Sequence, residues 1–248
     1  MRRGSRFDSR CRCDQTLRHS GNARVAALDI IHLYCRLKHS QSTWTSRLPH
    51  GYVCDFPFDE VPYLFVSSQI RPNKNFFNLL KAYEFVLRRR YRNLKLVITG
   101  DLIAEGLGLK GLIHERGLDL DVVSLPNIPL DVHAAFYHLA TLTIVPTLFE
   151  GGFPFQFSES MSVGTPVVMS DIAATRELLP DNLVERMLFD PTDPHSMAAR
   201  IEWALDNCAA LFDLQKPFYE DMQTRTWDKV ANEYLEVFRE VAAGSRNG

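Results

Sequence analysis

Residues 141–170 read TLTIVPTLFEGGFPFQFSESMSVGTPVVMS. The run 141–146 is apolar and predicts a buried strand, after which come a glycine-rich turn, a helix and a second apolar run. Gly151 and Gly152 permit positive φ and close backbone approach, and Pro154 stiffens the turn. Because the start of a helix presents unpaired N–H groups and the positive end of a dipole, the stretch predicts an anion site.

Two carboxylates bracket this turn, Glu150 before the glycines and Glu159 after them. An ordinary strand-to-helix connection would also hold them, the first as a solvated acid and the second as a first-turn acid that favours the helix dipole. The sequence on either side of the turn decides between a ligand site and a plain connection.

Strands and helices alternate along the chain from about residue 61. Strands are expected at 63–68, 94–99, 121–125, 141–146, 165–170 and 187–190. Helices are expected at 75–90, 109–116, 132–139, 173–179, 194–207 and 227–241, and a further helix follows the glycine turn. Apolar strands separated by helices specify a parallel sheet covered on both faces, so the predicted fold class is α/β, a doubly wound Rossmann-like domain over 61–248.

The first 60 residues have a different composition from the rest of the chain. Residues 1–50 carry ten Lys or Arg against three acids, which leaves eighteen against twenty-seven in the other 198 residues, a net charge of −9 there. A zinc site is not expected. Only one residue separates Cys11 from Cys13, which is shorter than the gap between zinc ligands, and the sequence offers no second pair of ligands to complete a site. We expect residues 1–60 to be a basic, disordered or irregular leader, the remnant of a lost amino-terminal domain.

Ligands of doubly wound sheets bind beyond the carboxyl ends of the strands. The loop 67–75 lies at that edge and carries Arg71 and Lys74 between a strand end and a helix start, which suits a diphosphate. Solvated loop charges are the alternative explanation. It is weaker for Lys74, because a cation at the amino end of a helix opposes the helix dipole.

The ordered motifs SSQIRPNKN, ITG, LPNIP and IVPTLFEGGFPFQFSESMSVGTPVVMSD, within residues 61–241, resemble the carboxy-terminal half of the group-one, family-four glycosyltransferases of the GT-B fold. The resemblance implies a retaining enzyme of glycan biosynthesis, of the hexosyltransferase type. Such an enzyme moves a sugar from a nucleotide-diphosphate sugar to a hydroxyl acceptor. It implies no metal ion and no other cofactor.

The resemblance also assigns donor-binding roles in the first loop. Lys74 matches the lysine that holds the donor diphosphate. The partner arginine of the family stands five residues earlier, where this chain has Gln69, and Arg71 is offset from that position by two residues.

In the glycine turn, the resemblance makes Glu150 the catalytic carboxylate beside the donor sugar and Glu159 the acceptor of hydrogen bonds from the ribose hydroxyls. The amides of Gly151, Gly152 and Phe153 would face the phosphates or the sugar. Eight residues separate the two glutamates where the family has seven, and a bulge in the turn can absorb the extra residue.

Two further features complete the predicted site. By resemblance, the backbone of Asn127 and Ile128 frames the nucleotide base, although a plain turn bounded by prolines is also consistent with these residues. His133 and His138 are five apart, which is unsuited to a metal pair on one helix face, so they are expected at the surface or in packing.

A GT-B enzyme has two Rossmann-like halves, and this chain has about sixty residues where the acceptor half is expected. Part of the apolar face of the last helix, with Trp227, Tyr234 and Phe238, would then lack a partner. Two hypotheses follow: a transferase whose acceptor domain is supplied by another domain or chain, and an inactive module that binds a nucleotide sugar. No nucleic-acid partner is expected, and Cys208 as the last cysteine suits a cytoplasmic location.

Overall fold

The computed structural model describes residues 58, 60–100, 102, 108–125 and 128–244. Within these residues the strands form one sheet in which every pairing is parallel, in the order β3-β2-β1-β4-β5-β6. The strands are β1 (Tyr63–Val66), β2 (Lys95–Ile98), β3 (Val122–Ser124), β4 (Leu142–Val145), β5 (Val167–Ser170) and β6 (Leu188–Phe189). The predicted Rossmann-like fold class is confirmed.

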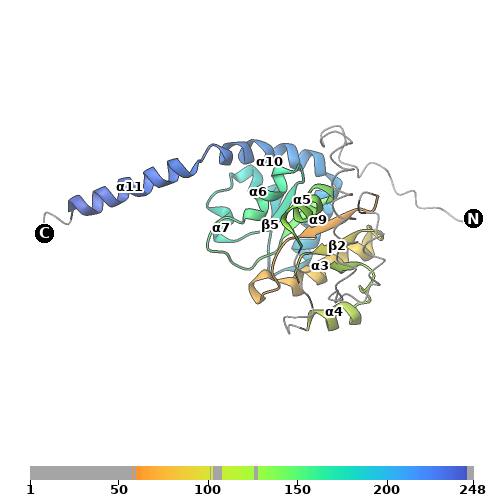
Figure 1. Ribbon diagram of the computed structural model, residues 1–248. Helices are drawn as coiled ribbons and strands as arrows, with labels where there is room; N and C mark the ends of the chain where they lie inside the picture. Colours follow the sequence, from red (N-terminus) through yellow and green to blue (C-terminus); the bar gives the residue numbers. More distant parts are fainter. Residues whose placement is uncertain (1–57, 59, 101, 103–107, 126–127, 245–248) are drawn as a thin grey trace, which may run out of the picture.

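Helices connect successive strands (Figure 1). They are the 3-10 helix η2 (Pro72–Lys74), α3 (Phe76–Arg89), α4 (Leu109–Glu115), α5 (Leu130–Leu139), α6 (Phe155–Ser162), α7 (Ala173–Arg176), α8 (Asp181–Met187), α9 (Pro194–Asp206), α10 (Cys208–Gln223) and α11 (Trp227–Gly244).

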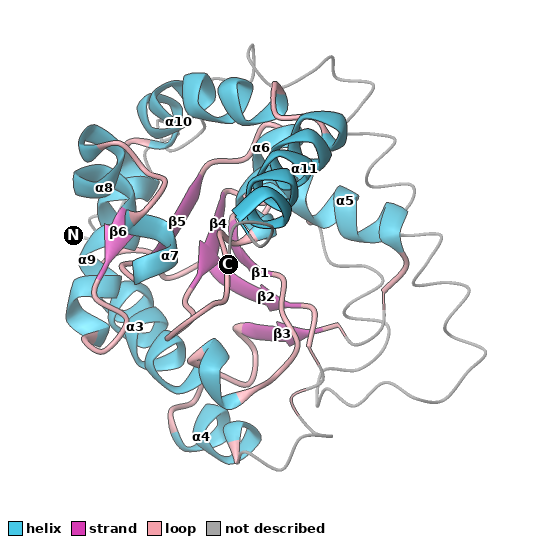
Figure 2. Ribbon diagram, turned by 90° about the vertical axis from the view of Figure 1, so that its left-hand side faces the viewer, coloured by secondary structure: helices cyan, strands magenta, loops and turns pink. Residues whose placement is uncertain are grey.

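Alternate residues of the central strand enter opposite faces of the sheet. Leu64 and Val66 of β1 belong to the apolar cluster formed with α3 and α9, whereas Tyr63 and Phe65 belong to the cluster formed with α5. Figure 2 shows α3 and α9 on one side of the sheet and α5 and α6 on the other. Because both faces are covered, the strands are predominantly apolar, as the sequence predicted; Lys95 at the start of β2 is half-buried and pairs with Asp121.

The packed body reaches slightly beyond the boundary expected at residue 61. Phe58 is buried and makes edge-to-face ring contacts with Tyr63 and Phe136, at centroid distances of 5.7 and 5.1 Å. The rest of the predicted leader, apart from Glu60, lies outside the described residues.

The sequence pattern did not predict two helices, α8 and α10, and it made α7 too long. Helix α10 contains Pro217, which ordinarily ends a helix because it lacks a backbone donor. Burial of Leu211 and Gln215 holds the helix against the sheet, and the Gln215 side-chain amide pairs with both backbone groups of Val167. Tertiary packing thus overrides the local helix-breaking signal.

Helix α11 extends away from the body at the carboxyl-terminal end (Figure 1). Trp227, Tyr234 and Phe238 are 86%, 62% and 62% exposed, as expected for an apolar face without a partner among the described residues. None of the helices that the structure describes is both long enough and apolar enough to cross a membrane.

Candidate functional site

A cavity lies where the strand order reverses, between the loops that follow β1 and β4. In a doubly wound sheet, this reversal is where neighbouring connections diverge and leave space for a ligand. The cavity has a volume of about 320 Å³ and is lined by Ser67, Ser68, Gln69, Arg71, Lys74, Phe155, Gln156 and Glu159. Four of these residues, Gln69, Arg71, Lys74 and Glu159, were predicted from the sequence.

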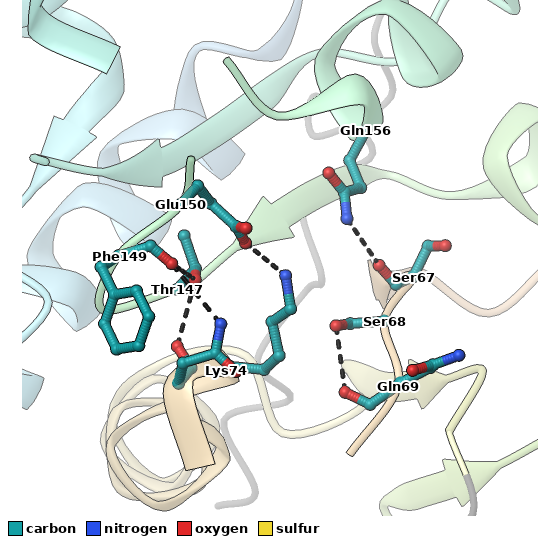
Figure 3. Close-up of polar contacts among 9 residues, drawn as sticks. Ser67, Ser68, Gln69, Lys74, Thr147, Phe149, Glu150 and Gln156 are labelled. Atoms are coloured by element: carbon teal, nitrogen blue, oxygen red, sulfur yellow. Dashed lines mark hydrogen bonds and ion pairs between the residues drawn. The ribbon is translucent and has the colours of Figure 1, made fainter. Parts of the chain in front are cut away.

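Backbone contacts tie the two loops together. The carbonyl of Asn73 accepts hydrogen bonds from the amide of Leu148 at 2.7 Å and from the hydroxyl of Thr147 at 3.1 Å. Across the cavity, the side-chain amide of Gln156 on α6 donates to the carbonyl of Ser67 at 3.2 Å (Figure 3). The walls of the cavity are therefore joined by hydrogen bonds.

The Lys74 ammonium group forms an ion pair with the Glu150 carboxylate, and Figure 3 shows the two side chains pointing toward each other. Their side chains are only 18% and 22% exposed, so the pair is largely shielded from water. Lys74 ends η2, and Asn75 follows in the left-handed region at φ 59° before α3 begins. The Asn75 side chain donates to the carbonyl of Pro191 at 2.7 Å, and this bond stabilises the left-handed conformation of Asn75.

Glu159 reaches the cavity from the second turn of α6, since the helix begins at Phe155 and its first turn contains no acid. The proposed role of a first-turn acid that favours the dipole therefore does not apply to Glu159. Its Oε2 accepts a hydrogen bond of 2.7 Å from the Tyr137 hydroxyl on α5. The carboxylate is held at the cavity wall by a specific donor.

The family model described as "Glycosyl transferases group 1" matches residues 56–221. The chain belongs to the group 1 glycosyltransferases. Among similar proteins, this glycosyltransferase chain is 27% identical over 187 residues to the lipopolysaccharide 1,2-N-acetylglucosaminetransferase of Salmonella typhimurium, covering 73% of this chain and 49% of that protein. It is 29% identical over 148 residues to a D-inositol 3-phosphate glycosyltransferase of Acidothermus cellulolyticus, covering 60% of this chain and 32% of that protein. The chain thus spans half or less of the length of these relatives.

Solved structures share the fold. A sucrose-phosphate synthase from Thermosynechococcus elongatus has a TM-score of 0.61 and 23% identity, covering 75% of this chain and 47% of that one. An α,α-trehalose 6-phosphate synthase from Burkholderia multivorans has a TM-score of 0.63 and 16% identity, covering 88% of this chain and 49% of that one. The predicted resemblance to one half of a GT-B glycosyltransferase is confirmed.

The glycine turn of the group 1 glycosyltransferase chain corrects one expectation. Neither Gly151 nor Gly152 has a positive φ, so the turn does not require glycine for its backbone conformation. A Cβ atom at either position would meet no atom within 4 Å, which leaves open space above the backbone. The Phe153 ring packs instead with Phe157 and Phe218, at centroid distances of 5.5 and 5.9 Å, and anchors the end of the turn.

The other predicted donor-binding residues lie partly at the cavity and partly away from it. Gln69 and Arg71 line the cavity and are exposed. Ile128 is partly buried against the apolar cluster beneath α5 and does not line the cavity. Asn127 lies outside the described residues. Among the residues that are described, no group of three or more His, Cys, Asp or Glu side chains could hold a metal ion.

Two side chains of α5 beside the site were not predicted as site residues. His133 was expected at the surface or in packing, and its ring does pack against Phe65 and Tyr137. Its Nε2 also lies 2.6 Å from the hydroxyl of cavity-lining Ser67. Tyr137, one helical turn later, bonds Glu159. Their spacing of four residues, which puts both on one helix face, was the signal available in the sequence. His138 does pack, since it is buried and its Nδ1 bonds the carbonyl of Val163 at 2.9 Å.

Burial perturbs the titration of both missed residues. It lowers the pKa of His133, against a smaller opposing influence of the Glu159 charge, and so favours the neutral imidazole. Burial also raises the pKa of the Tyr137 hydroxyl, which keeps it protonated as a hydrogen-bond donor. The site therefore combines two cations, Arg71 and Lys74, with two carboxylates and neutral hydrogen-bonding groups.

Proposed function

We propose that this chain is the donor-binding half of a retaining, metal-independent glycosyltransferase of the hexosyl type, which moves a sugar from a nucleotide-diphosphate sugar to a hydroxyl acceptor. The observation that carries the proposal is the cavity at the strand-order reversal, whose lining combines Lys74, the start of α6 and the carboxylate of Glu159. A diphosphate needs the first two groups, and a ribose diol needs the third.

The charges that develop when the nucleoside diphosphate leaves the sugar match this arrangement. As the nucleoside diphosphate leaves, negative charge grows on its phosphate and positive charge grows at the anomeric carbon of the sugar. The Lys74 ammonium, the Arg71 guanidinium and the N–H groups at the start of α6 would stabilise the phosphate charge. These groups supply the neutralisation that a metal ion provides in other transferases.

Glu150 would act at the sugar. Its carboxylate forms an ion pair with Lys74. A donor diphosphate competes for the same ammonium group, and its binding would release Glu150 toward the adjacent sugar. There the carboxylate would orient the hydroxyls and stabilise the oxocarbenium-like carbon. The open space above Gly151 and Gly152 would accommodate this part of the donor.

The acceptor site would come from another domain or chain, because the described body contains one half of a GT-B arrangement. We propose a cytoplasmic location for the same reaction. The alternative function is a module that binds a nucleotide sugar without turnover. It is favoured by the lining of the cavity, whose charged groups suit a donor and include no acceptor domain.

Isothermal titration with UDP, GDP and ADP tests the donor site. UDP is included because a TarM structure of the same fold was solved in complex with it. Loss of a charge-assisted contact should weaken binding by about ten- to hundredfold in Lys74→Ala. Lys110→Ala on α4, which changes an exposed lysine that does not line the cavity, is the matched control and should bind normally.

Two results would contradict the assignment: no binding of any of the three nucleotides by the wild type, or equal binding by Lys74→Ala. Incubation with the nucleotide sugar corresponding to the bound nucleotide then separates the two functions. If the wild type releases the nucleoside diphosphate and Glu150→Ala does not, the site is that of a transferase. Binding without release favours the inert module.

A further inference from the structure

Two hydrogen bonds join α5 to the cavity beside the carboxylate of Glu159. His133 Nε2 lies 2.6 Å from Ser67 Oγ, and the Tyr137 hydroxyl lies 2.7 Å from Glu159 Oε2. Because His133 and Tyr137 are one helical turn apart, the two hydrogen-bonded pairs lie on one face of α5.

The direction of the Tyr137 bond follows from donor and acceptor chemistry. A carboxylate only accepts, so Tyr137 donates its single proton to Glu159. Between Ser67 and His133 either partner can donate, because a hydroxyl and a neutral imidazole each hold a donor and an acceptor. The fixed donor to Glu159 is therefore the Tyr137 hydroxyl.

Packing fixes the rings of both α5 residues. The Tyr137 and His133 rings lie 4.9 Å apart, and both contact the ring of Phe65, at 4.7 and 5.9 Å. Phe65 is fully buried on β1, and Tyr137 is only 2% exposed. The backbone carbonyl of Tyr137 also accepts a hydrogen bond of 2.7 Å from the Thr165 hydroxyl. The tyrosine hydroxyl cannot follow Glu159 if the carboxylate turns away.

We infer that Tyr137 is a positioning residue for the ribose-binding carboxylate. The inference rests on the proposed function, because it deepens the role of Glu159 toward the ribose. A glutamate side chain has three rotatable bonds, and a donor that holds Oε2 leaves Oε1 to meet the hydroxyl pair in one orientation. Orienting the carboxylate before the ligand arrives reduces the entropy lost on binding.

Tyr137→Phe tests the inference, because it removes only the hydroxyl and keeps the ring contacts with Phe65 and His133. The probe is whichever of UDP, GDP and ADP binds the wild type most tightly, compared with its 2′,3′-dideoxy analogue. The variant should bind the ribonucleotide about tenfold more weakly and the dideoxy analogue within about twofold of the wild type. The preference for ribose should therefore collapse, which a purely structural loss would not produce.

Tyr83→Phe is the matched control. Tyr83 is also a buried tyrosine, and its hydroxyl donates to the carbonyl of Leu94 at 2.7 Å beneath α3. Its loss should lower stability and leave the ribose preference unchanged. Glu159→Ala should lower the ribose preference, and adding Tyr137→Phe to it should cost little more, because alanine leaves no carboxylate for the hydroxyl to hold.

The outcomes separate the two proposals. No nucleotide binding by the wild type refutes the proposed function, whereas a wild-type ribose preference that Tyr137→Phe retains refutes only the positioning role. Equal weakening of both ligands, or full additivity with Glu159→Ala, also refutes it. If Tyr137→Phe does not fold, Glu159→Asp tests the same contact, because the shorter side chain keeps the charge and moves it away from the Tyr137 hydroxyl. Its ribose preference should fall by at least about twofold, and an unchanged preference would overturn the inference.

Discussion

Replacing Glu150 by Gln should strengthen the binding of a nucleoside diphosphate, although it removes a residue of the site. The change keeps the size of the side chain and an oxygen that can accept from Lys74, but it deletes the negative charge. That charge is paired with the Lys74 ammonium group, which a diphosphate would need. The same charge would also repel the incoming phosphates.

The burial of the pair sets the size of the effect. Exposed ion pairs contribute about 0.2–1 kcal/mol, while removing one partner of a fully buried pair costs about 3–5 kcal/mol. The two side chains are 18% and 22% exposed, so the pair lies between these cases. An intermediate value of about 1.4 kcal/mol corresponds to a tenfold decrease in the dissociation constant.

Titration calorimetry with the tightest-binding nucleotide measures this directly. Glu150→Asp retains the charge and should not show the gain, and Glu185→Gln removes an exposed acid of α8 as a control for net charge. The gain should shrink as salt is added, because screening weakens the competing pair. Unchanged or weaker binding by Glu150→Gln would refute competition between Glu150 and the diphosphate for Lys74.

Two further outcomes concern the body of the protein. Gly100→Ala should lower the free energy of unfolding by about 1–3 kcal/mol through overpacking, since its Cβ would lie 2.5 Å from Ile70 Cδ1 and 2.8 Å from the carbonyl of Ser68. Urea denaturation measures this, Gly111→Ala in open space on α4 should show no such loss, and an equal midpoint for wild type and Gly100→Ala would contradict it. The lowered pKa of His133 means that the unfolded chain binds a proton there more readily, so this contribution to stability is complete above about pH 6.5 and is lost as pH falls through the lowered pKa. His133→Gln should lose less stability than the wild type between pH 7.5 and 5, and parallel losses would show that His133 is not responsible.

The sequence predicted the sheet because a buried parallel strand is apolar throughout, and β1, β4 and β5 are buried along their whole lengths. It predicted Lys74 and Glu159 because each lies in a loop or helix that begins at a strand end, and parallel strands bring those ends to one edge.

The missed features depend on tertiary contacts that no local pattern encodes. Tyr137 and His133 look like ordinary residues of a mostly apolar helix until β1 and α6 bring Ser67 and Glu159 to them. The backbone angles of Gly151 could not be inferred, because glycine is compatible with either sign of φ.

The hydrogen bonds between the two loops have a consequence for the rate of ligand capture. Because the carbonyl of Asn73 holds the loop after β4, and the Asn75 side chain holds the chain beyond β6, the backbone frame of the cavity is already assembled. The first movement required of the protein is then the rotation of the Lys74 and Glu150 side chains away from each other. Because this step moves side chains and no backbone segment of the cavity, nucleotide capture is expected to proceed without a slow ordering phase.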